Sequence, residues 1–476
     1  MSAARSASLS SRLPAADAVT GLVERARSAM QRFAPSDQQR VDEAVTALAW
    51  SIYKPEHARE LAEIAVATTR LGNVEDKVVK NQRKTFGTLR DLMRVRTVGV
   101  IEEDPARGLT LYAKPVGVVA AVTPSTNPAA TPVNKAMMAV KGRNAVIIAP
   151  SPVAHKTTGR TVELMREALD RVGAPADLVQ VLPAPVTRAA TTALMEACDL
   201  SVVTGSQNNV RAGYRSGKPA IGVGAGNAPI IVDDSADLAR AAKGICASKT
   251  FDNATSCSSD NALVVLDSVY DRAIAALEAV GGYLADEEEK AAIAAALWVE
   301  GKLNRDLIAR DAAVIADRVG MGPEARSARF FLVEDELPAD PRSFADEKLS
   351  LVLTVYRARD IMDAIATVKA ILQVKGRGHS CGIYTSSLDN ARLVASELDV
   401  VRVLVNQPHA IGNGGSFSNG LPFTLTMGCG TWAGNSITEN LNYRHFINIT
   451  HLSTTIPEDR PSEEELFGEH WKRHGM

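Results

Sequence analysis

The chain lacks an excess of charge of either sign: 53 lysines and arginines stand against 55 aspartates and glutamates among 476 residues, a formal net charge of −2. A protein that binds nucleic acid or an anionic membrane chiefly through electrostatics carries a basic excess, so both classes are disfavoured. The chain also lacks a run of roughly 18 to 20 apolar residues that could cross a bilayer. Its most apolar run, residues 116–122, has the length of one strand. These absences leave a globular protein of about two or three domains.

Cysteine is scarce as well. The five cysteines are odd in number and widely spaced, with no CxxC pair and no Cys/His group at zinc spacing. This disfavours a zinc site, and no metal is expected. A chain of this length builds a large core without disulfides. The remaining question is which thiol, if any, reacts.

Acidic residues are missing from residues 1–16, which contain serine and arginine. That composition faintly resembles a transit peptide, but it has no clear amphipathic pattern. We expect a flexible N-terminal arm and, without a signal peptide, a cytoplasmic protein.

Hydrophobic periodicity divides the rest of the chain. Residues 17–95 carry apolar residues at spacings of three and four, which predicts helices. Two apolar stretches around an Asp-Pro-Ala-Arg-Gly turn predict a hairpin over 98–113. From residue 116 strands alternate with helices, and a second such series starts near Pro229, with a helix expected over 269–284. This alternation is typical of parallel, doubly wound α/β sheets, which bind ligands beyond the carboxyl ends of their strands.

One cysteine differs from the others in its surroundings. Cys257 ends the polar segment that begins at Phe251 (Phe-Asp-Asn-Ala-Thr-Ser-Cys), between an expected helix and an expected strand. A core cysteine would lie among aliphatic residues instead. Cys257 is therefore the candidate nucleophile, and a buried, unreactive thiol is the alternative.

Several long motifs resemble the aldehyde dehydrogenase superfamily, over about residues 20 to 450. They are the cysteine loop, Val116-Gly-Val-Val-Ala-Ala-Val-Thr-Pro-Ser-Thr-Asn-Pro and Val203-Thr-Gly-Ser. Two further segments are more specific and resemble the CoA-acylating branch, which includes the aldehyde half of bifunctional aldehyde/alcohol dehydrogenases. They are Lys218-Pro-Ala-Ile-Gly-Val-Gly-Ala-Gly-Asn-Ala-Pro and Gly428-Cys-Gly-Thr-Trp-Ala-Gly-Asn-Ser-Ile-Thr-Glu-Asn.

The fold that this resemblance implies is aldehyde dehydrogenase-like: two doubly wound α/β domains and a β-hairpin oligomerisation arm. Edge strands in such an arm need a partner, so a homodimer or homotetramer is expected. The implied division of the chain is a flexible arm over 1–16, a nicotinamide dinucleotide-binding domain over 17–96 and 117–228, an oligomerisation arm over 97–116 and 441–455, a catalytic cysteine domain over 229–440 and a C-terminal tail over 456–476.

The resemblance also gives Cys257 a role. Its thiolate would attack an aldehyde to give a thiohemiacetal, whose oxyanion would be held by the side-chain amide of Asn127 and the backbone N–H of Cys257. Hydride transfer to a nicotinamide would then leave a thioacyl enzyme. For Asn127, a turn residue before Pro128 is the alternative.

One residue of the hydrolytic relatives is missing. They carry a glutamate that activates water, and alignment on Pro229 puts Val223 at that place. Valine cannot accept a proton, so attack by water would lose about 10² to 10⁴ in rate. Coenzyme A needs less help, because its thiol ionises like cysteine and thiolate is intrinsically nucleophilic. The expected reaction converts aldehyde, CoA and NAD(P)+ into acyl-CoA and NAD(P)H.

The cofactor residues are expected where strands end. Many NAD-preferring relatives have a glutamate near Pro152, but this chain has no acid from 150 to 162 and offers His155 and Lys156, which favours NADP over NAD. Residues 204–206 would bind pyrophosphate at a helix N-terminus. Glu347 matches the family glutamate that contacts the nicotinamide ribose, with an exposed loop glutamate as the alternative. The expected set is Thr123, Pro124, Ser125, Pro150, Ser151, His155, Lys156, Gly205, Ser206, Gly224 and Glu347.

Substrate contacts in the family lie around residues 406–419, which here are polar. A long-chain aldehyde is therefore disfavoured. His409, with Asn413 and Ser416, could hold a small anionic group, as in the similar members that act on sulfoacetaldehyde. Acetaldehyde and propanal are the rival substrates. A hydrolytic aldehyde dehydrogenase, a reductase of acyl phosphates and a catalytically silent binding protein are the rival functions.

Overall fold

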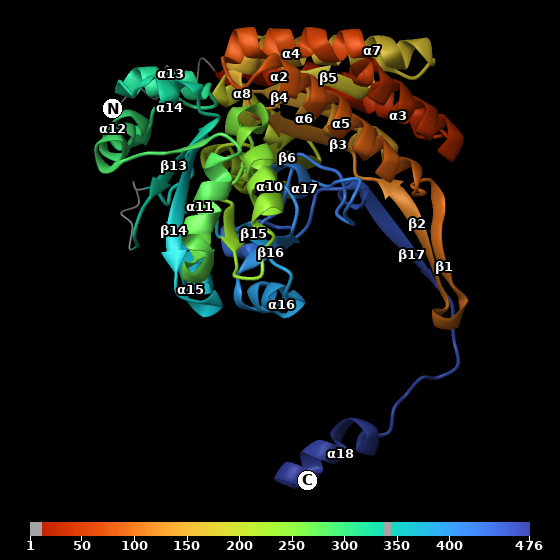
Figure 1. Ribbon diagram of the computed structural model, residues 1–476. Coiled ribbons are helices and arrows are strands. Elements are labelled where there is room, and N and C mark those ends of the chain that lie inside the picture. The colour runs from red at the N-terminus through yellow and green to blue at the C-terminus, as the bar shows by residue number, and fades with distance from the viewer. Residues whose placement is uncertain (1–11, 338–343) are drawn as a thin grey trace, which may run out of the picture.

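The computed structural model describes residues 12–337 and 344–476. Two parallel β-sheets with helices on their faces form the body, and a small antiparallel sheet extends from it (Figure 1). This confirms the predicted fold class. Residues 1–11 of the expected N-terminal arm lie outside the described residues, and helix α2 begins at Arg12, within that arm.

The first sheet has the strand order β5-β4-β3-β6-β7, and all neighbouring strands are parallel. Its order reverses between β3 and β6, so the loops after these strands open a crevice at the carboxyl edge, where sheets of this kind bind ligands. The strands are β3 (Val118–Thr123), β4 (Ala145–Pro150), β5 (Val179–Val181), β6 (Leu200–Thr204) and β7 (Ala220–Val223).

The helices of the N-terminal half pack on this sheet or on one another, around one hydrophobic cluster that runs from Val19 to Ile221 and also takes in Leu441 and Phe446. They are α2 (Arg12–Phe33), α3 (Gln38–Tyr53), α4 (Pro55–Thr69), α5 (Val74–Met93), α6 (Ala130–Lys141), α7 (His155–Arg171), α8 (Arg188–Ala197) and α9 (Gln207–Arg215).

The second sheet is also parallel throughout, in the order β10-β13-β14-β9-β8-β15-β16. A separate hydrophobic cluster, from Ile230 to Val400, fills the space around it. Its strands are β8 (Pro229–Val232), β9 (Ala262–Leu266), β10 (Gly282–Leu284), β13 (Phe330–Glu334), β14 (Val352–Ala358), β15 (Gly378–Tyr384) and β16 (Val400–Val405).

The expected helix over 269–284 is wrong in its second half. The helix there, α11, covers Tyr270–Glu278, and the chain then enters β10. Gly281 has a φ of +99°, which helical backbone does not allow, and it turns the following apolar residues into the sheet. The other helices of this half are α10 (Leu238–Thr250), α12 (Glu287–Leu297), α13 (Ala312–Val319), α14 (Pro323–Ser327), α15 (Ile361–Val374), α16 (Leu388–Glu397) and α17 (His409–Gly412).

The predicted hairpin is present as β1 (Gly99–Asp104) and β2 (Leu109–Pro115). β17 (Ile447–Ser453), from the far end of the chain, adds to it antiparallel and completes a three-stranded sheet. Beyond Ile447 the residues of β17 are exposed, so this sheet offers an uncovered edge and face. A two-stranded hairpin, β11 (Trp298–Val299) with β12 (Lys302–Leu303), lies elsewhere.

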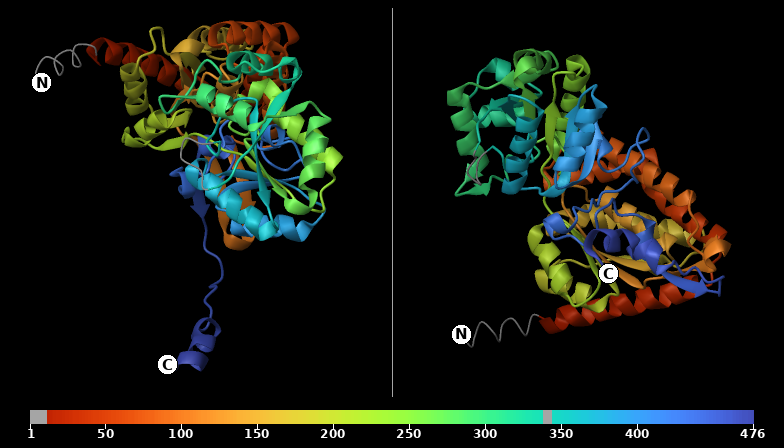
Figure 2. Two further views of the ribbon diagram at one scale, coloured as in Figure 1. Left: turned by 60° about the vertical axis from the view of Figure 1, so that its left-hand side comes forward. Right: turned by 90° about the horizontal axis from the view of Figure 1, so that it is seen from below.

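The C-terminal residues run away from the body and end in α18 (Glu463–His474), which stands apart in Figure 1 and in the left view of Figure 2. Leu466 and Phe467 of this helix are exposed. Within the part of the chain that the structure describes, no helix is long and apolar enough to span a membrane.

Candidate active site

The loop that carries the candidate nucleophile has an unusual backbone. After α10 ends at Thr250, residues Asp252, Asn253 and Ala254 follow with φ of 51°, 52° and 60°. Left-handed backbone at non-glycine residues costs on the order of 1–3 kcal/mol each and persists only where the surroundings hold it. The approach to Cys257 is therefore held by contacts from other parts of the chain.

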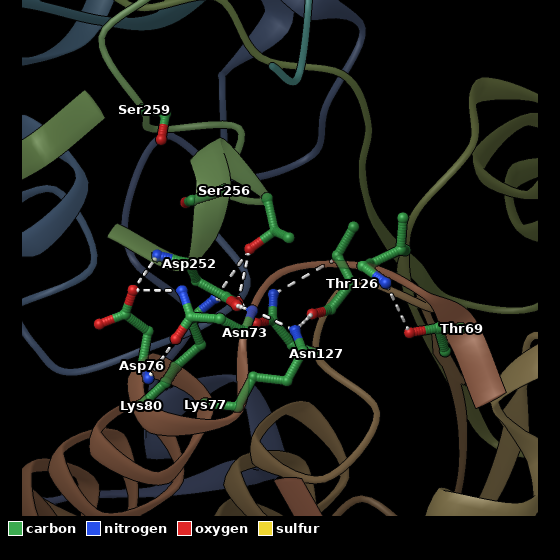
Figure 3. Close-up of polar contacts among 12 residues, drawn as sticks. Thr69, Asn73, Asp76, Lys77, Lys80, Thr126, Asn127, Asp252, Ser256 and Ser259 are labelled. Carbon is green, nitrogen blue, oxygen red and sulfur yellow. Dashed lines mark hydrogen bonds and ion pairs between the residues drawn. The ribbon is translucent and has the colours of Figure 1, made fainter. Parts of the chain in front are cut away.

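Helix α5 supplies those contacts (Figure 3). Lys77 Nζ lies 2.9 Å from Asp252 Oδ2, and Lys80 Nζ lies 2.5 Å from the same oxygen. Lys80 also donates to Thr255 Oγ1 at 3.0 Å. Burial alone would raise the pKa of Asp252, but the charges of Lys80 and Lys77 outweigh it, and the pKa is lowered. Asp252 is thus a buried anion between two cations, which fits a structural role.

Lys77 also reaches the loop of the second candidate catalytic residue. Its Nζ donates to the backbone oxygen of Thr126 at 3.2 Å, so one ammonium joins the Asn127 loop to the Cys257 loop. Burial lowers the pKa of Lys77 to about 8, and Asp252 acts in the opposite direction. Lys77 is charged at neutral pH and can hold both loops together.

The Asn127 side chain has few fixed contacts. Its Nδ2 makes one long contact of 3.4 Å with Thr126 Oγ1 (Figure 3). Its Oδ1 is buried without a hydrogen-bond partner among the described residues. An amide in this state can still donate to a ligand, which is the property an oxyanion donor requires.

Cys257 lies close to a histidine that the sequence did not single out. A Cβ at Gly226 would lie 2.8 Å from Cys257 Cβ and 2.8 Å from His379 Nε2, so only glycine lets these groups approach. His379 Nδ1 hydrogen-bonds Ser380 Oγ at 2.7 Å, while Nε2 is buried with no hydrogen-bond partner in the described part of the chain. The one signal in the sequence was a polar His-Ser pair inside an otherwise apolar strand, β15.

Electrostatics make the thiol a weak acid here. Burial raises the pKa of Cys257 to about 12, with Glu347 acting in the same direction, while a hydrogen bond with Ser258 and the charge of Arg402 oppose the rise. The thiol is therefore protonated at neutral pH and needs a base at the moment of attack. Burial, aided by Arg402, lowers the pKa of His379, so its ring is neutral and Nε2 has a free lone pair, while the same shift makes the imidazole a weak base.

Glu347 is buried, so the exposed loop glutamate considered above is wrong. Burial raises its pKa to about 7, and Lys375, 3.8 Å away, opposes the rise. Glu347 and Cys257 line the same small pocket. The remaining lining residues are Asn227, Lys249, Ala254, Ser256, Ser259, Asn261 and Leu349.

The fold gathers most of the expected cofactor residues at one edge. Thr123 ends β3 and Pro150 ends β4, and Ser151 N donates to Thr123 O at 3.1 Å. Thr123 Oγ1 is buried and has no hydrogen-bond partner among the described residues. Gly205, Ser206 and Gly224 follow the neighbouring strands β6 and β7. The carboxyl edge of the first sheet therefore presents the loops that the sequence assigned to a dinucleotide.

The two cations assigned to the adenosine end differ from each other. His155 Nε2 is 3.1 Å from the backbone oxygen of Leu182, so the ring is held by the protein. Lys156 is exposed in the first turn of α7. Lys156 is therefore the more exposed of these two side chains.

The three expected substrate residues are buried and already bonded. His409 Nε2 lies 2.8 Å from Ser380 Oγ, and burial lowers the pKa of His409 to about 3, so its ring is neutral. Asn413 accepts from Arg402 Nε at 2.9 Å and donates to Ser258 Oγ at 3.0 Å. Ser416 Oγ lies 2.9 Å from Ser418 Oγ. These contacts shape the wall beside Cys257 and leave it without a charged group from these three residues.

Val223, which the resemblance aligned with the glutamate of hydrolytic relatives, is buried at the end of β7. Asp252, the other acid considered as a base, is bound between two lysines. Neither position offers a carboxylate to activate water.

The fold and this cysteine site define the class of protein. The chain belongs to the aldehyde dehydrogenase family, whose model matches residues 11–420. This confirms the resemblance that the motifs predicted.

The curated relatives narrow the comparison. Sulfoacetaldehyde dehydrogenase (acylating) of Cupriavidus necator is 50% identical over 462 residues, which cover 97% of this chain and 94% of that protein. The protein of the same name from Bilophila wadsworthia is 44% identical, covering 96% and 99%. Among solved structures, an acetylating aldehyde dehydrogenase from Geobacillus thermoglucosidasius superposes with a TM-score of 0.90 at 34% identity, covering 95% and 99%.

Proposed function

We propose that the protein is a CoA-acylating aldehyde dehydrogenase that converts sulfoacetaldehyde into sulfoacetyl-CoA with NAD(P)+. The observation that carries the proposal is a reactive-site cysteine beside a free histidine nitrogen, at a site where Val223 replaces the water-activating carboxylate. The near full-length similarity to two acylating sulfoacetaldehyde dehydrogenases supports the choice of aldehyde.

In this proposal His379 Nε2 accepts the thiol proton while Cys257 Sγ attacks the carbonyl carbon. The Asn127 amide and the backbone N–H of Cys257 donate to the oxyanion as it forms, and each such donor contributes about 3 to 4 kcal/mol. A nicotinamide cofactor, when bound, would supply the hydride acceptor. Glu347 and the loops at the ends of β3, β4 and β6 are the residues that would hold it.

The acyl group then leaves Cys257 through a second thiol. The CoA sulfur bonds to the acyl carbon as the Cys257 Sγ–carbon bond breaks, and the proton lost by the CoA thiol returns to Cys257. Water needs a stronger base than a thiol does, and neither Val223 nor the ion-paired Asp252 provides one. In this proposal His379 serves the Cys257 thiol and Glu347 serves the cofactor. This step decides between an acylating and a hydrolytic enzyme.

The cofactor preference is the finer part of the proposal. Absence of an acid between Pro150 and Val162, together with the exposed Lys156 at the start of α7, favours NADP over NAD. Comparison of kcat/KM for the two cofactors tests it. A strong preference for NAD would contradict it.

The decisive experiment follows NAD(P)H formation from sulfoacetaldehyde, acetaldehyde and propanal, with and without CoA, and identifies the product. We expect sulfoacetyl-CoA, dependence on CoA and complete loss of activity in Cys257→Ala. Free acid formed without CoA would instead identify a hydrolytic enzyme, and dependence on phosphate an acyl phosphate reductase. A much higher kcat/KM for acetaldehyde or propanal than for sulfoacetaldehyde would assign that aldehyde as the substrate instead.

We also propose that the antiparallel sheet of β1, β2 and β17 joins protomers into a homodimer or homotetramer. Its exposed strand β17 includes the apolar residues Ile449 and Leu452, which are 41% and 49% exposed. Light scattering at micromolar concentration tests this, and a monomer would contradict it.

A further inference from the structure

Four basic residues of α5 lie buried or half-buried near the site: Lys77, Lys80, Arg83 and Lys84. The first two have a carboxylate partner, Asp252. Arg83 and Lys84 have none within ion-pair distance among the described residues. A cation that is taken out of water without a counter-charge is costly, and proteins usually pair such groups or use them to bind an anion.

Lys84 is 8% exposed, and its Nζ donates to the backbone oxygen of Gly414 at 2.7 Å. That is one of its three N–H donors. Its Nζ also lies 5.5 Å from the centre of the Phe423 ring. A carbonyl dipole and an aromatic face stabilise an ammonium only partly, so Lys84 retains capacity for a charged ligand.

Arg83 stands beside Lys84 and contacts the same segment of chain. Its Nη1 donates to the backbone oxygen of Ile411 at 3.3 Å, and its guanidinium lies 5.6 Å from the Phe423 ring centre. The two cations therefore share one aromatic ring and contact backbone oxygens three residues apart. Arg90 also packs on Phe423, but its guanidinium forms an ion pair with Asp91 at 2.7 Å, so its charge is compensated.

A short series of contacts connects Lys84 to the residue after Cys257, although neither Lys84 nor Arg83 lines the small pocket around the thiol. A Cβ at Gly414 would be 2.7 Å from Lys84 Nζ and 3.7 Å from Met427 Sδ. Met427 Sδ in turn lies 3.4 Å from the hydroxyl of Ser258, the residue after Cys257. When Cys257 is ionised, its thiolate raises the pKa of Lys84, so the two groups lie within electrostatic range of each other.

We propose that Lys84, assisted by Arg83, binds the negatively charged end of the aldehyde substrate while Cys257 attacks its carbonyl carbon. This rests on the proposed function and deepens it: it supplies the positive charge that His409, Asn413 and Ser416 do not. A sulfonate offers three acceptor oxygens, and it can accept from the Lys84 ammonium and the Arg83 fork together. The aldehydes selected are short ones with an anionic group near the carbonyl.

The test compares sulfoacetaldehyde with acetaldehyde, which has the same reacting group and no charge. In Lys84→Met we expect kcat/KM for sulfoacetaldehyde to fall about 10- to 100-fold, the range for losing a hydrogen bond to a charged group. The value of kcat/KM for acetaldehyde should change by less than about threefold.

Three further variants complete the comparison. Lys84→Arg should keep most of the preference for sulfoacetaldehyde over acetaldehyde, and in Arg83→Gln kcat/KM for sulfoacetaldehyde should fall about three- to tenfold. Lys243→Met, an exposed lysine of α10, is the matched control and should change neither.

Equal losses for both aldehydes in Lys84→Met, or no loss for either, would overturn the inference. A binding measurement that needs no turnover separates it from the proposed function. Ethanesulfonate, an unreactive anion, should raise the Tm of the wild-type protein and of Lys243→Met, but not that of Lys84→Met; uncharged dimethyl sulfone should raise none. If the wild type fails to form sulfoacetyl-CoA, the proposed function fails; if it forms it and Lys84→Met keeps its preference, only this inference fails.

Discussion

Two pairs of basic residues in α5 have different surroundings. Near the start of the helix, Lys77 and Lys80 meet the carboxylate of Asp252 and fix the loop of Cys257 (Figure 3). One turn after Lys80, Arg83 and Lys84 contact backbone oxygens and the ring of Phe423, and neither forms an ion pair with any residue that the structure describes. A cation paired with a carboxylate is part of the scaffold, whereas we propose that the cations without such a partner bind a ligand. The partner of a charge, more than its burial, distinguishes the two roles.

The largest effect is expected from removing the carboxylate partner of Lys77 and Lys80, which leaves them without an anion, as Arg83 and Lys84 are. Asp252→Asn removes the charge that Lys77 and Lys80 share and leaves two buried cations unpaired. Breaking a buried ion pair from one side costs about 3 to 5 kcal/mol, so the free energy of unfolding should fall by that amount. Urea unfolding measures it. Asp234→Asn, at an exposed acid after β8, is the control; equal stability of the two variants would refute a scaffold role for Asp252.

A second prediction separates positioning from substrate binding. Lys77→Met removes the contact between the Asn127 loop and the Cys257 loop, and a misplacement of about 1 Å can cost about 10² in rate. We expect kcat to fall by up to about that factor for sulfoacetaldehyde and acetaldehyde alike. Stopped-flow measurement of the hydride-transfer rate for both aldehydes compares this variant with Lys84→Met. In Lys84→Met only the rate for sulfoacetaldehyde should fall. If Lys77→Met slowed the reaction of sulfoacetaldehyde but not that of acetaldehyde, Lys77 would have the substrate-binding role that we assign to Lys84.

A third prediction uses pH. Burial lowers the pKa of Lys84 to about 7, with Arg83 and Lys80 acting in the same direction and Cys257 opposing them. The ammonium is charged below that pKa and neutral above it. The ratio of kcat/KM for sulfoacetaldehyde to that for acetaldehyde should therefore fall by up to about tenfold as pH rises from 6 to 9. Taking the ratio cancels the ionisation of Cys257, and a ratio that is constant with pH would speak against Lys84.

The smallest effect concerns stability without substrate. The pKa of Lys84 is lower in the folded protein than in the unfolded chain, so protonation below about pH 7 disfavours folding, and this penalty disappears as pH rises towards 10. Lys84→Met should therefore be more stable than the wild type by about 1 kcal/mol at pH 6, with the difference vanishing at higher pH. Thermal unfolding at pH 6 and pH 9 checks this. A destabilised variant at pH 6 would place Lys84 with the scaffold lysines.

Much of the fold was predictable because its signals are local. Strands such as β3 and β4 are continuous apolar runs, and helix α7 ends just before the stop signals Gly173 and Pro175. The prediction of a helix over 269–284 was wrong because periodicity cannot tell an apolar strand from the end of an apolar helix. Gly281, whose backbone leaves the helical region, decided it.

The site was predictable only in part. Cys257, Asn127 and Glu347 lie in motifs that resemble a known family, and in the structure Glu347 is buried while Cys257 and Asn127 are half-buried. His379 was missed, because a histidine within a buried strand has no local mark of chemistry. Its proximity to Cys257 depends on Gly226, which lies more than 150 residues away along the chain.

By itself the sequence determined the alternation of strands and helices, the polar loop around one cysteine and the missing carboxylate at Val223, because these are properties of neighbouring residues. Only the tertiary structure decided which lysines of α5 meet an anion and which do not, since Asp252 and Gly414 lie about 170 and 330 residues further along the chain. Hydrophobic patterns report which face of a helix is buried. They do not report the partners of the charges on that face, because those are set by contacts between distant segments.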